Sequence, residues 1–158
     1  MVDKSSGKLY NVRIMRLWHQ RLIHHLPFKQ LLGQHRECCA LRGMGWGRKH
    51  SVVDYVFSYE IGRLYEYHNL VMFECCRRGI YIDTNWFLRT YRGKKLGVRS
   101  LTEVGTYVHY QGEIIYPEHD DRYLLECVLN LKRKGAQLVN GLTLEEIILE
   151  LESRGVQS

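Results

Sequence analysis

Apolar residues recur at helical spacing in four separate segments of the sequence, and this pattern limits the fold more than any other feature. The segments cover residues 28–42, about 59–78, about 120–134 and about 144–153. Each holds apolar residues three or four positions apart, which places them on one face of an α-helix. The sequence therefore predicts a mainly α protein, a compact single-domain bundle of three to four helices.

The helix boundaries are marked by residues with known terminal preferences. Pro27 suits the first position of a helix, and Thr143 with Glu146 forms a capping box before the last segment. Gly79 can adopt the left-handed conformation that ends a helix. Between the first two helices, GMGWG at 43–47 holds too many glycines for a regular helix and predicts a loop.

Further segments complete the predicted organisation. Residues 106–116 alternate weakly around a Gln-Gly pair, which favours a small β-hairpin insertion. Residues 1–14 lack apolar patterning and are predicted to be an N-terminal extension. We expect residues 15–135 to form the helical domain, and 136–158 to add an acidic C-terminal helix packed on the same domain.

Several functional classes do not fit the sequence. No apolar run approaches the roughly 18 residues of a membrane span. Residues 1–14 lack the apolar stretch of a signal peptide, so we expect a cytoplasmic protein with no membrane partner. The five cysteines lack a CxxC spacing, and the eight histidines lack HxxxH or HExxH arrangements. We therefore expect reduced thiols, no metal and no cofactor.

The charge is distributed unevenly along the chain. The whole sequence has a net charge of +6, but residues 1–50 alone hold ten Lys and Arg against two acids. Residues 101–158 hold five against ten, a net charge of −5. A one-sided basic surface attracts polyanions, and DNA, RNA and an anionic membrane are the candidates. The alternative is a basic protein whose charge serves its solubility.

QHRE at 34–37 is the first candidate site. Glu37 is one of the two acids in the basic block, and a lone carboxylate there weakens phosphate binding unless it has a function. It can act as a catalytic carboxylate while neighbouring arginines such as Arg36 and Arg42 hold phosphates. Alternatively, Glu37 forms an ion pair with an arginine one turn away.

Two basic loops are the other candidates. Trp46 in the glycine-rich loop can stack on a base, and the residues after it, Arg48, Lys49 and His50, can contact phosphates. In the YRGKK loop, Arg92 can reach a backbone phosphate. The alternatives are a helix connector whose Trp46 packs on the core, and a solvated basic loop.

QLLGQHRE at 30–37 is similar to the segment that carries the catalytic glutamate in pyrimidine-dimer DNA glycosylases of the phage endonuclease V type. RKH follows it at nearly the family's spacing. Residues 53–82 resemble the family's long central helix, and YPEHDDRYLLEC at 116–127 resembles the start of its last helix. The resemblance runs over about 15–134 and is closest to a shorter bacterial branch that begins MRLWH, the sequence found here from Met15.

The resemblance implies a compact helical domain with glycosylase and abasic-site lyase activity. In such a protein the free N-terminal α-amine attacks C1′ of the damaged nucleotide, the base leaves, and a protonated imine undergoes β-elimination. An α-amine has a pKa of about 8, and a nearby carboxylate can stabilise the positive charge. Glu37 takes the place of the family's glutamate and Met15 that of its nucleophile. Arg16 and Arg36 match arginines that hold phosphates.

The chain also departs from the family pattern. Fourteen residues precede Met15, so its nitrogen is an amide, and the phage enzyme has a small hydroxyl residue at this position. Ala40 stands where the family has a further arginine, for which Arg42 can substitute. The acidic segment 140–158 replaces an aromatic C-terminal segment.

With Glu37 and the Met15 α-amine as catalytic groups, we expect a DNA-repair glycosylase and lyase that acts on double-stranded DNA with damaged or abasic sites. The predicted DNA-binding residues are Arg16, Gln34, His35, Arg36, Arg42, Trp46, Arg48, Lys49, His50 and Arg92. We favour a monomer associated with the nucleoid. Two alternatives stay open: a non-catalytic nucleic-acid-binding protein on the same scaffold, and an interaction domain whose acidic tail docks on its basic face.

Overall fold

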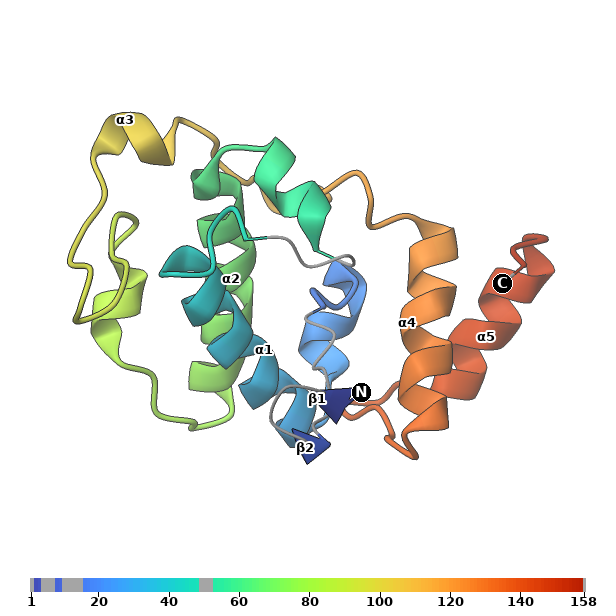
Figure 1. Ribbon diagram of the computed structural model, residues 1–158. Helices are drawn as coiled ribbons and strands as arrows, with labels where there is room; N and C mark the ends of the chain where they lie inside the picture. The colour runs from blue at the N-terminus through green and yellow to red at the C-terminus, as the bar shows by residue number, and fades with distance from the viewer. Residues whose placement is uncertain (1, 4–7, 10–15, 49–52, 158) are drawn as a thin grey trace.

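The computed structural model describes residues 2–3, 8–9, 16–48 and 53–157, and it is mainly helical (Figure 1). These residues contain four helices of ten residues or more, which confirms the predicted helical bundle. The four are α1 (Phe28–Arg42), α2 (Ile61–Arg77), α4 (Asp121–Arg133) and α5 (Leu144–Ser153).

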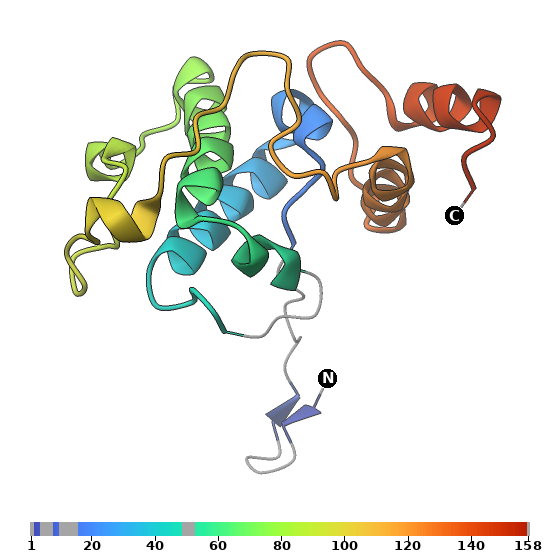
Figure 2. The ribbon, with the colours of Figure 1, turned by 90° about the horizontal axis from the view of Figure 1, so that it is seen from above.

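Short elements connect the long helices. They are the 3-10 helices η1 (Gln20–His25), η2 (Asp54–Ser58) and η3 (Thr84–Phe87), and the one-turn helix α3 (Leu101–Val104). Strands β1 (Val2–Asp3) and β2 (Lys8–Leu9) form an antiparallel pair, which lies apart from the helices in Figure 2. Within the described ranges, no helix is both long and apolar enough to span a membrane.

Helices α1 and α2 pack against each other and form the centre of the fold. The buried side chains of α1 include Leu31, Cys38 and Leu41, which follow one another at helical spacing. Helix α2 meets them with Leu64 and Val71, which also have no exposed surface. Full burial of a leucine side chain contributes roughly 1.5–3 kcal/mol, so these few residues supply much of the stability of the pair.

The segment before α1 fills the space between the α1–α2 pair and α4 (Figure 1). Leu17, Leu22 and Leu26 from this segment have no exposed surface, and Leu124 and Val128 of α4 belong to the same core cluster. The residues directly after position 15 are therefore held in the interior between helices rather than lying on the surface.

Most helix boundaries agree with the sequence patterns. The capping box of α5 is confirmed, because Thr143 Oγ1 accepts from Glu146 N at 3.1 Å and Glu146 Oε1 accepts from Thr143 N at 3.1 Å. Pro27 stands one position earlier than predicted, as the N-cap of α1. Helix α2 begins at Ile61 rather than about residue 59, because Tyr59 has an extended backbone that closes η2.

The β-hairpin predicted over 106–116 does not form in this part of the described chain, which has no paired strands. Side chains from other elements take the place of cross-strand partners. The backbone N–H of His109 donates to Glu66 Oε1 at 2.9 Å, and that of Ile115 donates to Gln20 Oε1 at 2.8 Å. These two backbone N–H groups already have hydrogen-bond acceptors, so they do not need the cross-strand hydrogen bonds of a β-hairpin.

A tight turn that the sequence analysis did not predict lies between Tyr91 and Val98, which form an isolated antiparallel bridge. Arg92 N–H donates to Gly97 O at 2.7 Å, and Gly97 N–H donates to Gly93 O at 2.9 Å. Gly93 has a φ of 103°, a conformation that strains residues with a Cβ atom. The turn gives the basic YRGKK segment a defined shape.

Candidate active site

Glu37 lies in the middle of α1 and is half-buried. The segment that precedes η1 crosses the helix at this point, where Arg16 N–H donates to Glu37 Oε2 at 3.3 Å. Gln34, one turn earlier on α1, donates its Nε2–H to the same oxygen at 3.3 Å. The Glu37 carboxylate therefore faces the peptide nitrogen that joins Arg16 to Met15.

Gln34 is buried, and both ends of its amide are hydrogen-bonded. Its Oε1 accepts from Trp18 N at 2.6 Å and contacts the Tyr67 hydroxyl at 2.8 Å, while its Nε2 donates to Arg16 O at 2.8 Å and to Glu37. An amide has two donor hydrogens and two acceptor lone pairs. Both hydrogens and one lone pair are used here, and the second lone pair shares the single Tyr67 hydroxyl hydrogen with Trp18 O. The predicted DNA contact of Gln34 stays a prediction, and the structure shows that the side chain holds the preceding segment against α1.

The two arginines nearest to Glu37 in the sequence motifs have different environments. The Arg16 guanidinium is directed to α4, where its Nη1 lies 3.4 Å from Glu126 Oε1, and it also lies 5.8 Å from the centre of the Trp18 ring. Arg36 is exposed on α1 beside Glu37. Arg36 is thus placed to meet a ligand in solution, while Arg16 reaches Glu37 through its backbone.

Arg42 is buried at the end of α1 with 1% of its surface exposed. Its Nη1 donates to Trp86 O at 2.8 Å and to His68 Nδ1 at 2.9 Å, and its Nη2 donates to Leu88 O at 2.9 Å. Burial lowers the pKa of Arg42 to about 10, which leaves it charged at neutral pH. The predicted phosphate contact stays a prediction, and in the structure Arg42 anchors η3 and the residues after it to α1.

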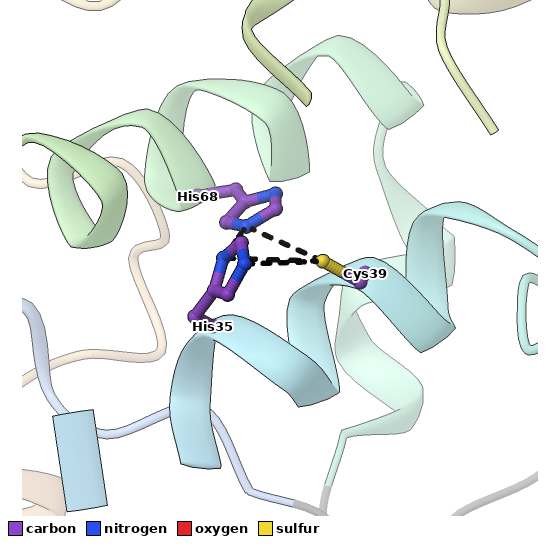
Figure 3. Close-up of side chains that lie close together, drawn as sticks. All are labelled: His35, Cys39 and His68. Atoms are coloured by element: carbon purple, nitrogen blue, oxygen red, sulfur yellow. Dashed lines mark hydrogen bonds between the residues drawn. The ribbon is translucent and has the colours of Figure 1, made fainter. Parts of the chain in front are cut away.

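Helices α1 and α2 bring three potential metal ligands together where they pack (Figure 3). His35 Nδ1 lies 2.9 Å from His68 Nε2, and Cys39 Sγ lies 3.7 Å from His35 Nε2 and 4.0 Å from His68 Nε2. Two imidazoles and a thiol are ligands that Zn²⁺ accepts. The sequence analysis missed this cluster because His68 comes from another helix, 33 residues after His35.

Arg42 decides how this cluster is protonated. Because Arg42 donates to His68 Nδ1, a neutral His68 carries its proton on Nε2 and donates it to His35 Nδ1. That proton occupies the lone-pair position that a metal ion needs. Burial lowers the pKa of His68 well below its usual value and raises that of Cys39 to about 12, so both are neutral at pH 7. The geometry favours a hydrogen-bonded chain that joins the helices, and it leaves His35 half-buried and engaged within the protein.

The glycine-rich loop after α1 places Trp46 against the protein. The Trp46 ring meets the Phe57 ring edge-on, with centroids 5.0 Å apart and an angle of 85°, and it packs against the core cluster. This contact agrees with the alternative in which the tryptophan is a packing residue. Arg92 from the neighbouring turn donates from Nη2 to Gly43 O at 3.3 Å, which fixes the turn beside the end of α1.

The exposed cations of this region define the candidate DNA-binding surface. Arg36 and Arg48 are exposed on α1 and the loop after it, and Lys94 and Lys95 are exposed at the tip of the 91–98 turn. The last turn of α1 and this tip line a common shallow depression. Three further predicted site residues lie outside the described residues: Met15, Lys49 and His50.

The acidic helix α5 lies away from this surface. It packs on α4, and Figures 1 and 2 show it on the side of α4 that faces away from α1. Glu150 reaches the N-terminal basic block at Arg21, with Nη2 and Oε2 3.2 Å apart, and it also pairs with Arg154 at 2.8 Å. An acidic tail docked over the basic face of α1 is therefore not the observed arrangement.

Tyr67 and Trp18 are site residues that the sequence analysis missed. The Tyr67 hydroxyl lies 2.7 Å from Trp18 O and 2.8 Å from Gln34 Oε1, and the Tyr67 side chain has no exposed surface. An aromatic ring with a polar tip on the buried face of a helix usually has a hydrogen-bond partner in the core. The position of Tyr67 next to His68, on the apolar face of α2, was the sequence feature that could have predicted this role.

A helical domain with a carboxylate facing the backbone just after residue 15 is what the family resemblance requires. Residues 15–88 match the family model described as pyrimidine dimer DNA glycosylase. The match covers slightly less than half of the chain and includes Glu37, Arg36 and the whole of α1 and α2. This part of the chain is therefore similar to the pyrimidine dimer DNA glycosylase family, as the motifs indicated. Comparisons with curated proteins and with solved structures gave no match.

Proposed function

We propose that this protein is a DNA glycosylase that acts on pyrimidine dimers or related damaged DNA and also cleaves abasic sites. The observation that carries the proposal is the 3.3 Å contact between Glu37 Oε2 and Arg16 N. In any peptide chain, the nitrogen of one residue lies within roughly 4 Å of the nitrogen of the next. We propose that an α-amine on residue 15 reacts beside the Glu37 carboxylate, and the position of Arg16 N supports this.

A carboxylate beside an amine supports imine chemistry at C1′ of the damaged nucleotide. The amine nitrogen bonds to C1′ while the glycosidic C–N bond breaks, and the base leaves with the bonding electrons and takes up a proton. Opening of the sugar ring gives a protonated imine, and removal of a C2′ proton then expels the 3′ phosphate. Glu37 stabilises the positive charge and transfers protons between these steps.

This chemistry requires a free α-amine on residue 15. In the full sequence Met15 is joined to Ile14 by a peptide bond, and an amide nitrogen is not a nucleophile. We propose that the active form begins at Met15, through initiation or cleavage at that point. The same peptide bond favours the second candidate function, a non-catalytic nucleic-acid-binding protein on the same scaffold.

Borohydride trapping tests the proposal, because it reduces a protein–DNA imine to a stable adduct. Chains that begin at Met1 and at Met15 are incubated with duplex DNA that contains an abasic site or a pyrimidine dimer. We expect an adduct from the chain that begins at Met15, and we expect Glu37→Gln to lower its formation rate by about 100-fold or more. Glu126→Gln is the matched control, because Glu126 contacts the Arg16 guanidinium rather than the Arg16 nitrogen.

The outcomes separate the candidate functions. Binding of DNA without an adduct from either chain favours the non-catalytic protein. An adduct that persists at the wild-type rate in Glu37→Gln removes Glu37 from the mechanism. An adduct from the chain beginning at Met1 that survives chemical blocking of its α-amine points to a lysine, and Lys29 and Lys49 are the candidates nearest in sequence to Glu37.

The basic turn gives a separate prediction for DNA affinity. Replacing Lys94 and Lys95 with glutamine is expected to weaken duplex binding about 3–10-fold and to reduce the salt dependence by about one to two counterions. Lys132→Gln with Arg133→Gln is the matched control, because it removes the same charge from the exposed end of α4. Duplex affinity is measured by fluorescence anisotropy at several salt concentrations. Equal losses of affinity in the two double variants contradict a direct contact between the 91–98 turn and DNA.

A further inference from the structure

We propose that Gln34 is the positioning residue of the candidate active site: its buried amide fixes the Glu37 carboxylate and the backbone of residues 16–18 in one arrangement. This inference rests on the proposed function, because it assigns the residue that holds the catalytic carboxylate. Gln34 acts through Glu37 and does not touch the DNA, since 1% of its surface is exposed.

The backbone contacts fix which end of the amide faces Glu37. Trp18 N–H is a donor, so the atom 2.6 Å from it is the amide oxygen. Arg16 O is an acceptor, so the atom 2.8 Å from it is the amide nitrogen. The second hydrogen on that nitrogen then points to Glu37 Oε2 at 3.3 Å. An inverted amide loses both backbone hydrogen bonds, so the donor side stays toward the carboxylate.

Tyr67 ties this arrangement to α2. Its hydroxyl has one hydrogen and lies 2.7 Å from Trp18 O and 2.8 Å from Gln34 Oε1. Three parts of the chain that are far apart in sequence therefore meet at Gln34: the segment after residue 15, α1 and α2. Moving that segment relative to α1 breaks at least two buried hydrogen bonds. The free-energy cost of breaking them keeps Arg16 beside Glu37.

The donor from Gln34 also favours one protonation state of Glu37. A hydrogen bond donated to a carboxylate stabilises the charged form, and Arg16 N–H donates to the same oxygen. Two donors on Oε2 limit rotation of a side chain that is otherwise flexible. The carboxylate oxygen is thus directed at the nitrogen of residue 16, as stabilisation of an adjacent positive charge requires.

Titration of the Glu37 carboxylate by carbon-13 NMR in the full chain tests this role without requiring activity. Gln34→Met keeps most of the side-chain volume and removes the donor. Gln34→Glu keeps an acceptor for Trp18 N and puts a second carboxyl group beside Glu37. We expect the Glu37 titration midpoint to move to higher pH by about one unit in Gln34→Met, and further in Gln34→Glu.

Tyr55→Phe is the matched control. It removes one partly buried hydrogen bond, between the Tyr55 hydroxyl and His119 Nε2 at 2.8 Å, and Tyr55 makes no hydrogen bond to Gln34 or Glu37 among the described residues. The Glu37 midpoint and the Arg16 amide resonance should stay at their wild-type positions in this variant. If Gln34→Met does not fold, the Arg16 amide resonance in Gln34→Glu decides, because a second carboxyl group raises the Glu37 midpoint by repulsion alone. An Arg16 resonance at its wild-type position in this variant overturns the proposal.

An unchanged Glu37 midpoint in a folded Gln34 variant overturns the proposal, whatever the trapping experiment gives. A midpoint that moves as expected supports it even if no imine adduct forms, in which case the proposed function fails and the positioning contact stands. Where the adduct does form, Gln34→Met should slow trapping about 10-fold or more, and the acid limb of its pH profile should follow the shifted midpoint.

Discussion

Replacing Arg42 with methionine is expected to destabilise the protein by about 3–5 kcal/mol, because several acceptors lose hydrogen bonds from a charged donor. Four acceptors lose the Arg42 donor at once: His68 Nδ1, Trp86 O and Leu88 O at 2.8–2.9 Å, and Tyr91 O at 3.3 Å. Of these, Leu88 O keeps a second donor, the Tyr91 N–H at 3.0 Å. Each buried acceptor left without a partner costs about 1–3 kcal/mol. Methionine fills much of the same volume, so the loss reports the hydrogen bonds rather than a cavity.

Urea denaturation of the Arg42→Met protein measures this loss directly, and the Tm is expected to fall by roughly 10 °C. Arg36→Met is the control, because Arg36 is exposed on the same helix and its replacement should change stability by about 0.5 kcal/mol or less. If the two variants are equally stable, Arg42 does not anchor the chain after η3, and a contact with phosphate becomes its better explanation.

The features predicted best from the sequence are those set by neighbouring residues. Helix α5 starts where the Thr143 and Glu146 pair requires, and α1 covers the predicted residues 28–42. A capping box and a helical stripe act within one or two turns, so distant parts of the chain do not alter them. The same holds for the motif around Glu37, which the family match supports.

The features that were missed depend on contacts between distant residues. The segment 106–116 has a plausible strand pattern, but Glu66 and Gln20 take its backbone donors. An arginine at the end of a helix usually lies in solvent and interacts with the helix dipole, yet Arg42 is buried because η3 brings carbonyl groups to it. The hydrogen bond between Arg42 and His68 can be identified only when the packing of α1 on α2 is known.

The candidate site shows the same division. Glu37 was found from its charge context and from the resemblance, which are properties of the sequence alone. Gln34 was assigned to DNA because it stands in the same motif, and its burial against Trp18 and Tyr67 supports the proposed positioning role. A motif indicates which residues share a candidate site, while the side-chain contacts distinguish the proposed catalytic residue from the proposed positioning residue.

Lowering the pH from 7.5 to 5 is expected to destabilise the protein by about 4 kcal/mol through two buried histidines. Burial lowers the pKa of His19 to about 4 and that of His119 to about 3, against 6.5 in the unfolded chain. Each ring already accepts a backbone N–H at Nδ1, from Arg21 and Gln20 respectively, so protonation must break a hydrogen bond.

The sign follows from which state binds protons in this pH range. Below pH 6.5 the unfolded chain protonates these histidines and the folded chain does not, so unfolding takes up protons and stability falls until the folded pKa values are reached. At pH 5 each histidine accounts for about 2 kcal/mol. In urea titrations at pH 7.5, 6 and 5, His119→Gln should therefore reduce the loss by about 2 kcal/mol, whereas His25→Gln, which changes a partly exposed ring, should leave it intact. A free energy of unfolding that stays constant from pH 7.5 to pH 5 means that both rings are protonated, or reach solvent, in the folded protein, and it contradicts their burial as neutral groups.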